Sequence, residues 1–129
     1  MRLFHKTLLI ISFLFSFTTG FAQSETEIII QNIQTANFNN LIGNWDDQVE
    51  VNIIDQVNQK AMSPVEANDH LRNFFNKHNI IGFDKNAERK LGNTIYVTGK
   101  LSAGQNKYSL TLLLQNTKKG LLIVSVRIS

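Results

Sequence analysis

Apolar and polar residues alternate through the second half of the chain with the period of two that is typical of β-strands. This pattern predicts strands at residues 83–88, 94–101, 107–115 and 121–128. Short turn sequences separate these segments, so we expect neighbouring strands to pair as antiparallel hairpins. An earlier strand is expected at residues 49–53, where Val49, Val51 and Ile53 alternate with polar residues. Residues 56–62 have no such alternation and are interpreted as a polar linker.

Two Ser-x-x-Glu sequences mark the starts of helices, because the serine and glutamate side chains can cap each other's backbone amides. One runs from Ser24 to Glu27, and the other runs from Ser63 to Glu66 with Pro64 at the favoured first helical position. The buried side of the first helix is expected to include Ile29, Ile30, Ile33, Ala36 and Phe38. The second presents Ala67, Leu71, Phe74, Phe75 and His78 on one face, at helical spacing. This order of elements predicts an α+β domain with helices on one face of a sheet.

The two faces of the predicted sheet both carry apolar residues. Tyr108, Leu110, Leu112 and Leu114 share the face that we assign to the core. In the last strand, alternation assigns Leu122, Val124, Val126 and Ile128 to the core. It leaves Leu121 and Ile123 on the second face, together with Leu113. We expect these three residues to form an apolar patch that is covered either by the chain itself or by another subunit.

The first 22 residues differ in composition from the rest of the chain. Arg2, His5 and Lys6 precede an uncharged apolar run that ends in the small residues Gly20 and Ala22, the order of a secretory signal peptide. We predict cleavage after Ala22, which leaves residues 23–129 as a single domain that is periplasmic or secreted. The apolar run is shorter than the roughly 20 residues that span a bilayer. No stable membrane anchor is therefore expected after cleavage.

Charge and cysteine content exclude several classes of function. Two of the 13 Lys and Arg residues lie in the predicted signal, which leaves 11 against 10 Asp and Glu. This balance predicts no nucleic-acid binding. The chain has no cysteine, so it has no disulfide, thiolate nucleophile or lipid-acceptor cysteine. His70 and His78 would lie about 12 Å apart along a helix, and no histidine-carboxylate cluster has ligand spacing, so neither a metal site nor a cofactor is expected.

The pattern of Ser63, Ala67, Leu71, Phe74 and Phe75 resembles the family catalogued as domain of unknown function 4783, which are small exported proteins of Bacteroidetes-type bacteria. The resemblance continues at Phe83, in the sequence Gly99-Lys100-Leu101, and in Val126-Arg127-Ile128. It implies a nuclear transport factor 2-like, or cystatin-like, fold. In this fold a curved antiparallel sheet, here of about four to five strands, wraps around two to three helices to form a cone with a cavity. The family often has a histidine and a glycine shortly after the position of Phe83, where this chain has Asp84-Lys85-Asn86-Ala87-Glu88.

The cone that this resemblance implies makes some residues candidates for a binding site. His78 could act as a base if it faced the cavity, although the favoured interpretation places it at the C-terminus of its helix, partly solvated and interacting with the helix dipole. Trp45, Tyr96 and Tyr108 combine an apolar body with a polar tip and could line the cavity mouth. They could also be plain core or rim residues. No catalytic residue is assigned.

Two hypotheses about function follow. The preferred one is a non-enzymatic exported module that binds a small apolar ligand or a protein partner, with a homodimer through the outer sheet face as one form. The alternative is an isomerase- or hydrolase-like enzyme that uses a residue in the cone pocket, with His78 or a nearby acid as base and Tyr96 or Tyr108 as donor. The enzyme hypothesis requires an enclosed pocket. A cone filled by Phe74, Phe75 and the leucines would argue against it.

Overall fold

A computed structural model describes residues 24–129, so the predicted signal peptide lies outside the described residues. The described part begins with helix α2 (Glu25–Gln34), which is followed by the short helix α3 (Phe38–Leu41) and the 3-10 turn η1 (Ile42–Asn44). Strands β1 (Trp45–Ile53) and β2 (Val57–Met62) precede helix α4 (Pro64–His78). Four strands complete the domain, namely β3 (Gly82–Leu91), β4 (Thr94–Ala103), β5 (Asn106–Thr117) and β6 (Gly120–Ile128). No helix within this described part is long and apolar enough to cross a membrane.

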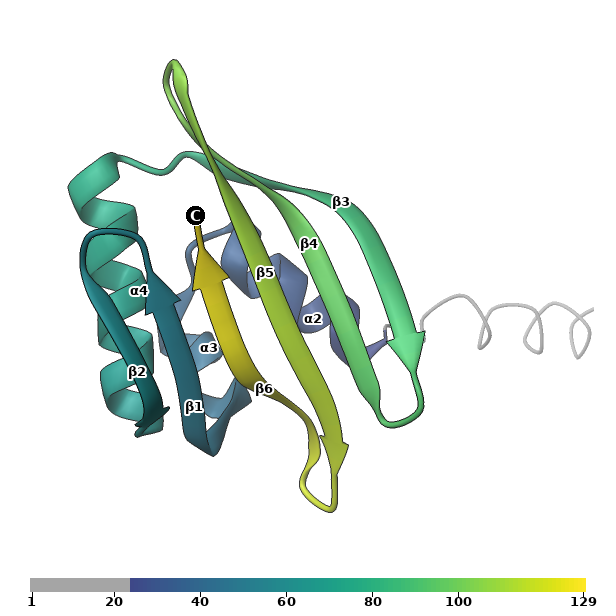
Figure 1. The fold of residues 1–129 in the computed structure, drawn as a ribbon. Helices are drawn as coiled ribbons and strands as arrows, with labels where there is room; N and C mark the ends of the chain where they lie inside the picture. Colours follow the sequence, from purple (N-terminus) through teal and green to yellow (C-terminus); the bar gives the residue numbers. More distant parts are fainter. Residues whose placement is uncertain (1–23) are drawn as a thin grey trace, which may run out of the picture.

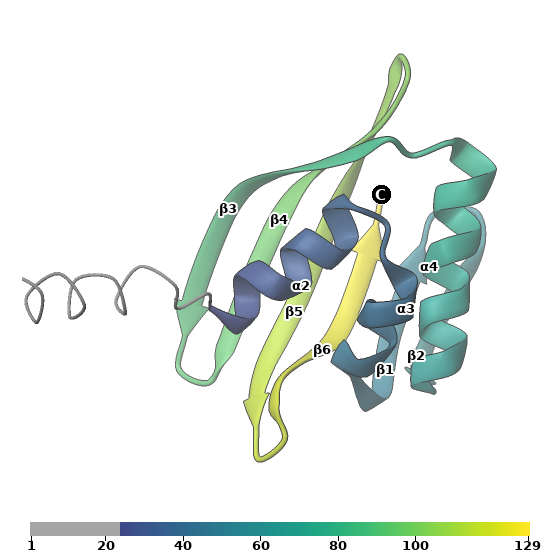
Figure 2. The same cartoon turned by 180° about the vertical axis from the view of Figure 1, so that it is seen from behind.

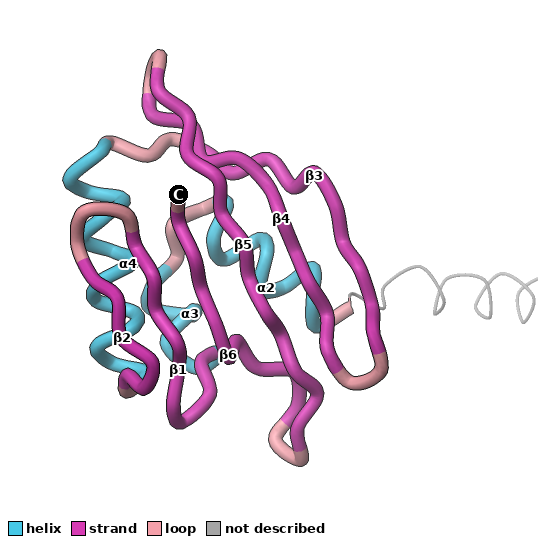
Figure 3. Tube along the Cα trace, viewed as in Figure 1, coloured by secondary structure: helices cyan, strands magenta, loops and turns pink. Residues whose placement is uncertain are grey.

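The strands form one sheet in the order β2-β1-β6-β5-β4-β3 (Figure 1). The pairs β3–β4, β4–β5 and β5–β6 are antiparallel, as the hairpin pattern predicted. The sheet is not wholly antiparallel, because β1 pairs with β6 in parallel. The β4–β5 hairpin extends well beyond the rest of the sheet (Figure 3).

The three α-helices of residues 24–129 lie on the same side of the sheet (Figure 2). Between the helices and the sheet, one continuous core buries Ile29 and Ile33 of α2 together with Leu71 and Phe74 of α4. The helix faces were therefore predicted correctly, except that Ala36 is exposed and has a left-handed backbone conformation at the end of α2. Burial of this apolar surface is the main favourable contribution to folding.

Both predicted helix starts are capped by serine. The Ser24 hydroxyl accepts a hydrogen bond from the backbone amide of Glu27, and the Ser63 hydroxyl accepts one from the amide of Glu66. The Ser63 hydroxyl also donates to the Glu66 carboxylate. Both helix starts could be predicted from the sequence because a cap depends on residues three positions apart.

The prediction of a polar linker at residues 56–62 was wrong, because this segment contains strand β2. It pairs antiparallel with β1, with Val57 opposite Ile53 and Met62 opposite Val49. Of the six side chains in β2, only that of Met62 is buried. An edge strand of this kind is held by backbone hydrogen bonds and needs little apolar surface, so its sequence lacks the alternation that identifies a strand.

The assignment of Leu121 and Ile123 to the outer sheet face was also wrong. Leu113 pairs with Ser125 but its neighbour Leu114 pairs with Ile123, so β6 carries one extra residue, Val124, at a β-bulge. A bulge of one residue reverses the direction of the side chains on one side of it. Leu121 and Ile123 therefore lie in the core, whereas Leu113 remains on the outer face.

Further register shifts occur in β1 and in β3, between Lys85 and Ala87. Such bulges bend strands and increase their twist, which is how the sheet curves around the helices. The predicted α+β class and curved sheet on helices are thus confirmed, with six strands instead of four or five.

Candidate functional site

Two of the predicted pocket residues meet at the end of α4. The Tyr108 hydroxyl lies within hydrogen-bonding distance of Nδ1 of His78, at 3.1 Å. Phe74 packs against both rings, with centroids 4.4 Å from His78 and 5.1 Å from Tyr108. Both His78 and Tyr108 are partly buried. The contact joins the C-terminus of α4 to β5, so it has a structural role in holding the helix on the sheet.

The backbone at the end of α4 fixes where His78 lies. Asn79 adopts a left-handed conformation and the amide of Ile80 donates to the carbonyl of Phe75, which closes the helix. Ile80 then packs against the core. His78 is therefore held at the edge of the apolar core beside Phe74, rather than facing an open cavity.

Trp45 is a core residue and not part of a cavity mouth. Its side chain is buried, and its Nε1 donates a hydrogen bond to Oδ1 of Asn68 at 3.0 Å. The Asn68 amide in turn donates to the carbonyl of Phe38 at 3.1 Å. Asn68 was missed by the sequence reasoning, although it lies three residues before Leu71 on the buried side of α4. Its position on that face was the available signal.

The inside of the cone is filled by side chains. Phe74 of α4 and the inward-facing leucines of β4 and β5 are fully buried, and these are Leu101, Leu110, Leu112 and Leu114. Every buried side-chain nitrogen and oxygen in residues 24–129 has a hydrogen-bond partner. The enzyme hypothesis required an enclosed pocket at this place, and these apolar side chains occupy it.

Tyr96 lies on the opposite side of the sheet from the helices. It is 40% exposed and pairs directly with Leu113 of β5. Leu113 pairs in turn with Ser125 of β6, which pairs with Glu50 of β1. On the other side, Tyr96 pairs with Arg89 of β3. Because directly paired residues share a face, these five residues form one row across the outer face, which we call the outer row.

A shallow depression with a volume of about 200 Å³ lies along the outer row. Its lining includes Tyr96 and Leu113 on one side, Ser125 in the middle, and Glu50 and Asn52 on the other. Thr111 and Arg127 from the neighbouring row complete it. The small side chain of Ser125 explains the hollow, because the residues on either side of it are larger.

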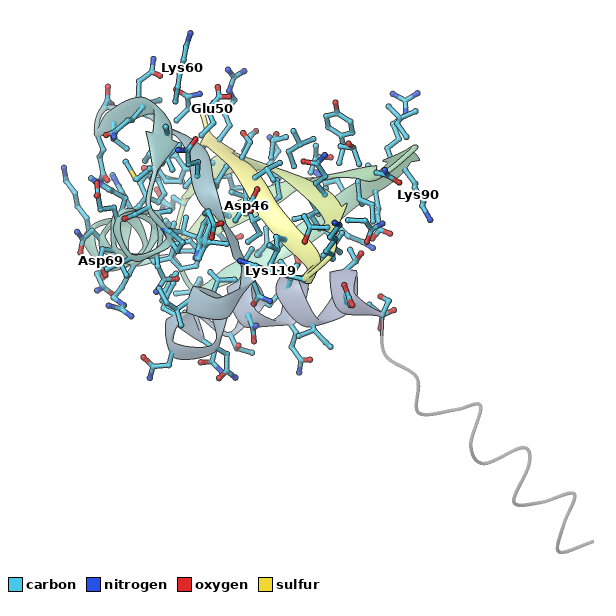
Figure 4. The ribbon with its side chains drawn as sticks, turned by 90° about the horizontal axis from the view of Figure 1, so that it is seen from below. Asp46, Glu50, Lys60, Asp69, Lys90 and Lys119 are labelled. Atoms are coloured by element: carbon cyan, nitrogen blue, oxygen red, sulfur yellow. The ribbon has the colours of Figure 1, made fainter. Side chains whose placement is uncertain are left out.

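Charge is distributed asymmetrically along the outer row. Arg89 at one end and Glu50 at the other are both exposed. Glu50 projects from the side of the sheet opposite α2 (Figure 4), and its carboxylate accepts a hydrogen bond from the Asn52 amide at 3.4 Å. The three ion pairs within residues 24–129 involve other side chains. Both charged groups are therefore available to a partner.

In the described part of the chain, no group of three or more His, Asp or Glu side chains is placed to hold a metal ion. The candidate residues divide into three places. His78 and Tyr108 meet at the end of α4, Trp45 lies in the core, and Tyr96 lies on the outer face with Leu113. Of these places, the outer face has an exposed aromatic side chain next to a hollow.

Comparison with solved structures identifies similar folds. A protein from Bacteroides ovatus is 20% identical in sequence to this chain. Its structure matches with a TM-score of 0.70, and the match covers 78% of this chain and 89% of the other. One from Bacteroides uniformis is 19% identical, with a TM-score of 0.73 over 82% and 96%. Both are described as proteins of the family with domain of unknown function 4783.

The fold extends beyond that family. A nuclear transport factor 2-like protein of unknown function from Pseudomonas putida is 11% identical, with a TM-score of 0.60 over 81% of this chain and 80% of its own. No curated protein matches the sequence. The family model described as domain of unknown function (DUF4783) matches residues 26–129. The chain is therefore a member of the DUF4783 family, with a nuclear transport factor 2-like fold.

Proposed function

We propose that this protein is an exported, non-enzymatic interaction module that binds a protein partner through the outer face of its sheet. The observation that carries the proposal is the exposed Tyr96 beside Leu113 at the edge of the hollow over Ser125. Aromatic residues are enriched at the centres of protein interfaces, where they supply a large contact area. Export is supported by the basic and apolar order of residues 1–22.

The outer face is large enough for a specific interface. Six strands at a spacing of about 4.8 Å make a face about 24 Å wide. β5 contains 12 residues, so the face is about 40 Å long at its centre. A stable interface buries about 800 Å² on each partner. The face can provide this area without any change in the fold.

A small apolar ligand is a weaker candidate than a protein. Such ligands bind in concave apolar sites that enclose most of their surface. The interior that could enclose a ligand is filled by Phe74 and the leucines of β4 and β5. The hollow on the outer face is shallow and has Glu50 and Arg127 in its lining, which suits a protein surface with polar groups at its rim.

Site-specific photocrosslinking in a cell that exports the full chain tests the proposal. The photoreactive residue p-benzoylphenylalanine replaces Gln115, which is exposed on the outer face and borders the outer row. The matched control carries it at Asn73, which is exposed on α4. We expect a protein adduct at position 115 and none at position 73. The adduct should disappear when Tyr96→Asp is added.

The outcome that would overturn the proposal is the absence of any adduct at position 115, or adducts of equal yield at both positions. Tyr96 is substantially exposed, so Tyr96→Asp should leave the fold intact. Circular dichroism of the purified variant checks this. An adduct that persists in the folded Tyr96→Asp variant would also argue against binding through the outer face.

A further inference from the structure

In the outer row, residues of opposite size and of opposite charge lie at equal distances on the two sides of the central residue, Leu113. Leu113 stands on β5, with two strands of the row on each side. One strand away lie the large Tyr96 on β4 and the small Ser125 on β6. Two strands away lie the basic Arg89 on β3 and the acidic Glu50 on β1. Tyr96 and Ser125 are thus complementary in size, and Arg89 and Glu50 are complementary in charge.

Such a row fits a second copy of itself. A two-fold axis that lies in the interface and runs along β5 turns the second copy face to face with the first and reverses the order of its row. Tyr96 of each copy then faces the hollow over Ser125 of the other, and Arg89 of each faces Glu50 of the other. Leu113 meets Leu113 on the axis. An isologous contact of this kind is the commonest arrangement of homodimers.

The geometry points to a second copy of this chain as the partner, bound through the outer row about this axis. This inference rests on the proposed function, whose binding face it uses. A two-fold axis along the row instead would place Arg89 against Arg89 and Glu50 against Glu50. Like charges in contact disfavour that arrangement.

The dimensions are compatible with direct ion pairs. Arg89 and Glu50 each lie about 10 Å to one side of Leu113, at two strand spacings of about 4.8 Å. Sheets that stack face to face lie about 10 Å apart. An extended arginine and an extended glutamate together span this gap. Symmetry supplies two such pairs in each dimer.

Sedimentation velocity with charge reversals tests the inference, using protein purified after export of the full chain. The wild type should be a dimer at micromolar concentration. Arg89→Glu alone and Glu50→Arg alone should each weaken association by on the order of 100-fold, because each creates two like-charge contacts. An equimolar mixture of the two variants should dimerise again, since every contact between them is then attractive. The double variant R89E/E50R should also dimerise.

Two control variants separate this effect from net charge. Lys77→Glu changes the charge as Arg89→Glu does, and Asp69→Arg changes it as Glu50→Arg does. Both residues are exposed on α4, on the helical side of the domain. Neither substitution should change the dimer by more than about twofold, since exposed charges far from a contact act weakly. Ser125→Phe, which fills the hollow, should weaken the dimer as strongly as the single reversals.

The outcomes distinguish this inference from the proposed function. A wild-type monomer, combined with a Gln115 crosslink to a different protein, overturns the inference and leaves the proposed function standing. A dimer that persists in both single reversals overturns the two-fold arrangement. A monomer without any crosslink at position 115 overturns both. Restoration of the dimer by mixing supports both, because no single-site folding defect is repaired by a second folded variant.

Discussion

The indole Nε1 of Trp45 donates a hydrogen bond to Oδ1 of Asn68 across the core, over a distance of 3.0 Å. Asn68 also contacts α3, because its side-chain amide donates a hydrogen bond to the Phe38 carbonyl. One side chain thus joins α4, β1 and α3. Both contacts are buried, where an unpaired polar group costs more than it does in water.

Asn68→Leu should therefore destabilise the domain by about 2–4 kcal/mol, since it leaves the Trp45 N–H and the Phe38 carbonyl without partners. Urea unfolding followed by fluorescence measures the loss, and Trp45 is the single tryptophan of the chain. The matched control is Asn73→Leu on the exposed side of the same helix, for which no comparable loss is expected. Equal stability of wild type and Asn68→Leu would contradict this role.

Gly99→Ala should destabilise the fold by about 1–3 kcal/mol. An added Cβ would overlap the backbone carbonyl of Asp84 and would lie 2.5 Å from the Phe83 ring, which covers Gly99 from the neighbouring strand. The backbone atom cannot move aside cheaply. Gly82→Ala is the control, because a Cβ there meets nothing within 4 Å. The melting temperatures of the Gly99→Ala and Gly82→Ala variants test this prediction. Similar values would contradict the close packing of Gly99 against Asp84 and Phe83.

Glu25→Ala should weaken the attachment of α2 to the sheet. Oε2 of Glu25 accepts a hydrogen bond from the backbone amide of Leu121 at 2.6 Å, at the start of β6. We expect a loss of roughly 1 kcal/mol, because the glutamate is largely exposed and water competes for the contact. Hydrogen exchange at the Leu121 amide should become faster than in the control Glu27→Ala. An unchanged exchange rate would show that the contact with Glu25 does not protect the Leu121 amide from exchange.

Substitutions at Ile123 and Leu113 should have different effects, although simple alternation places both residues on one face. Ile123→Asp introduces a charge into the core and should prevent stable folding, whereas Leu113→Asp should fold and lose association. Circular dichroism and sedimentation of the two variants provide the comparison. A folded Ile123→Asp protein would contradict the bulge at Val124.

Local features of the fold were readable from the sequence. The serine caps at Ser24 and Ser63, the buried face of α4 and the core face of β5 each depend on residues a few positions apart. The same holds for the hairpins that join β3 to β6. In these places local pattern and tertiary packing favour the same structure, and the prediction was correct.

The candidate site could not be predicted in the same way. The sequence predicted Trp45, His78, Tyr96 and Tyr108 as candidates for one cavity. In the structure only His78 and Tyr108 meet, whereas Trp45 is buried in the core and Tyr96 lies on the outer face of the sheet. The structure also removed Leu121 and Ile123 from the outer patch, because one extra residue in β6 changes which side chains face outward. A single bulge is nearly invisible in an apolar strand, where residues on both sides of it are hydrophobic.

Local sequence patterns were sufficient to predict where the helices begin, which helix faces are apolar, and that a run of hairpin strands follows them. The register of the folded sheet, which these patterns do not show, places five residues from five different strands in one row, namely Arg89, Tyr96, Leu113, Ser125 and Glu50. The physical reason is that strand register depends on the whole sheet. Backbone hydrogen bonds are nearly the same in any register, so the choice is made by the packing of the core and by the bulges that adjust it.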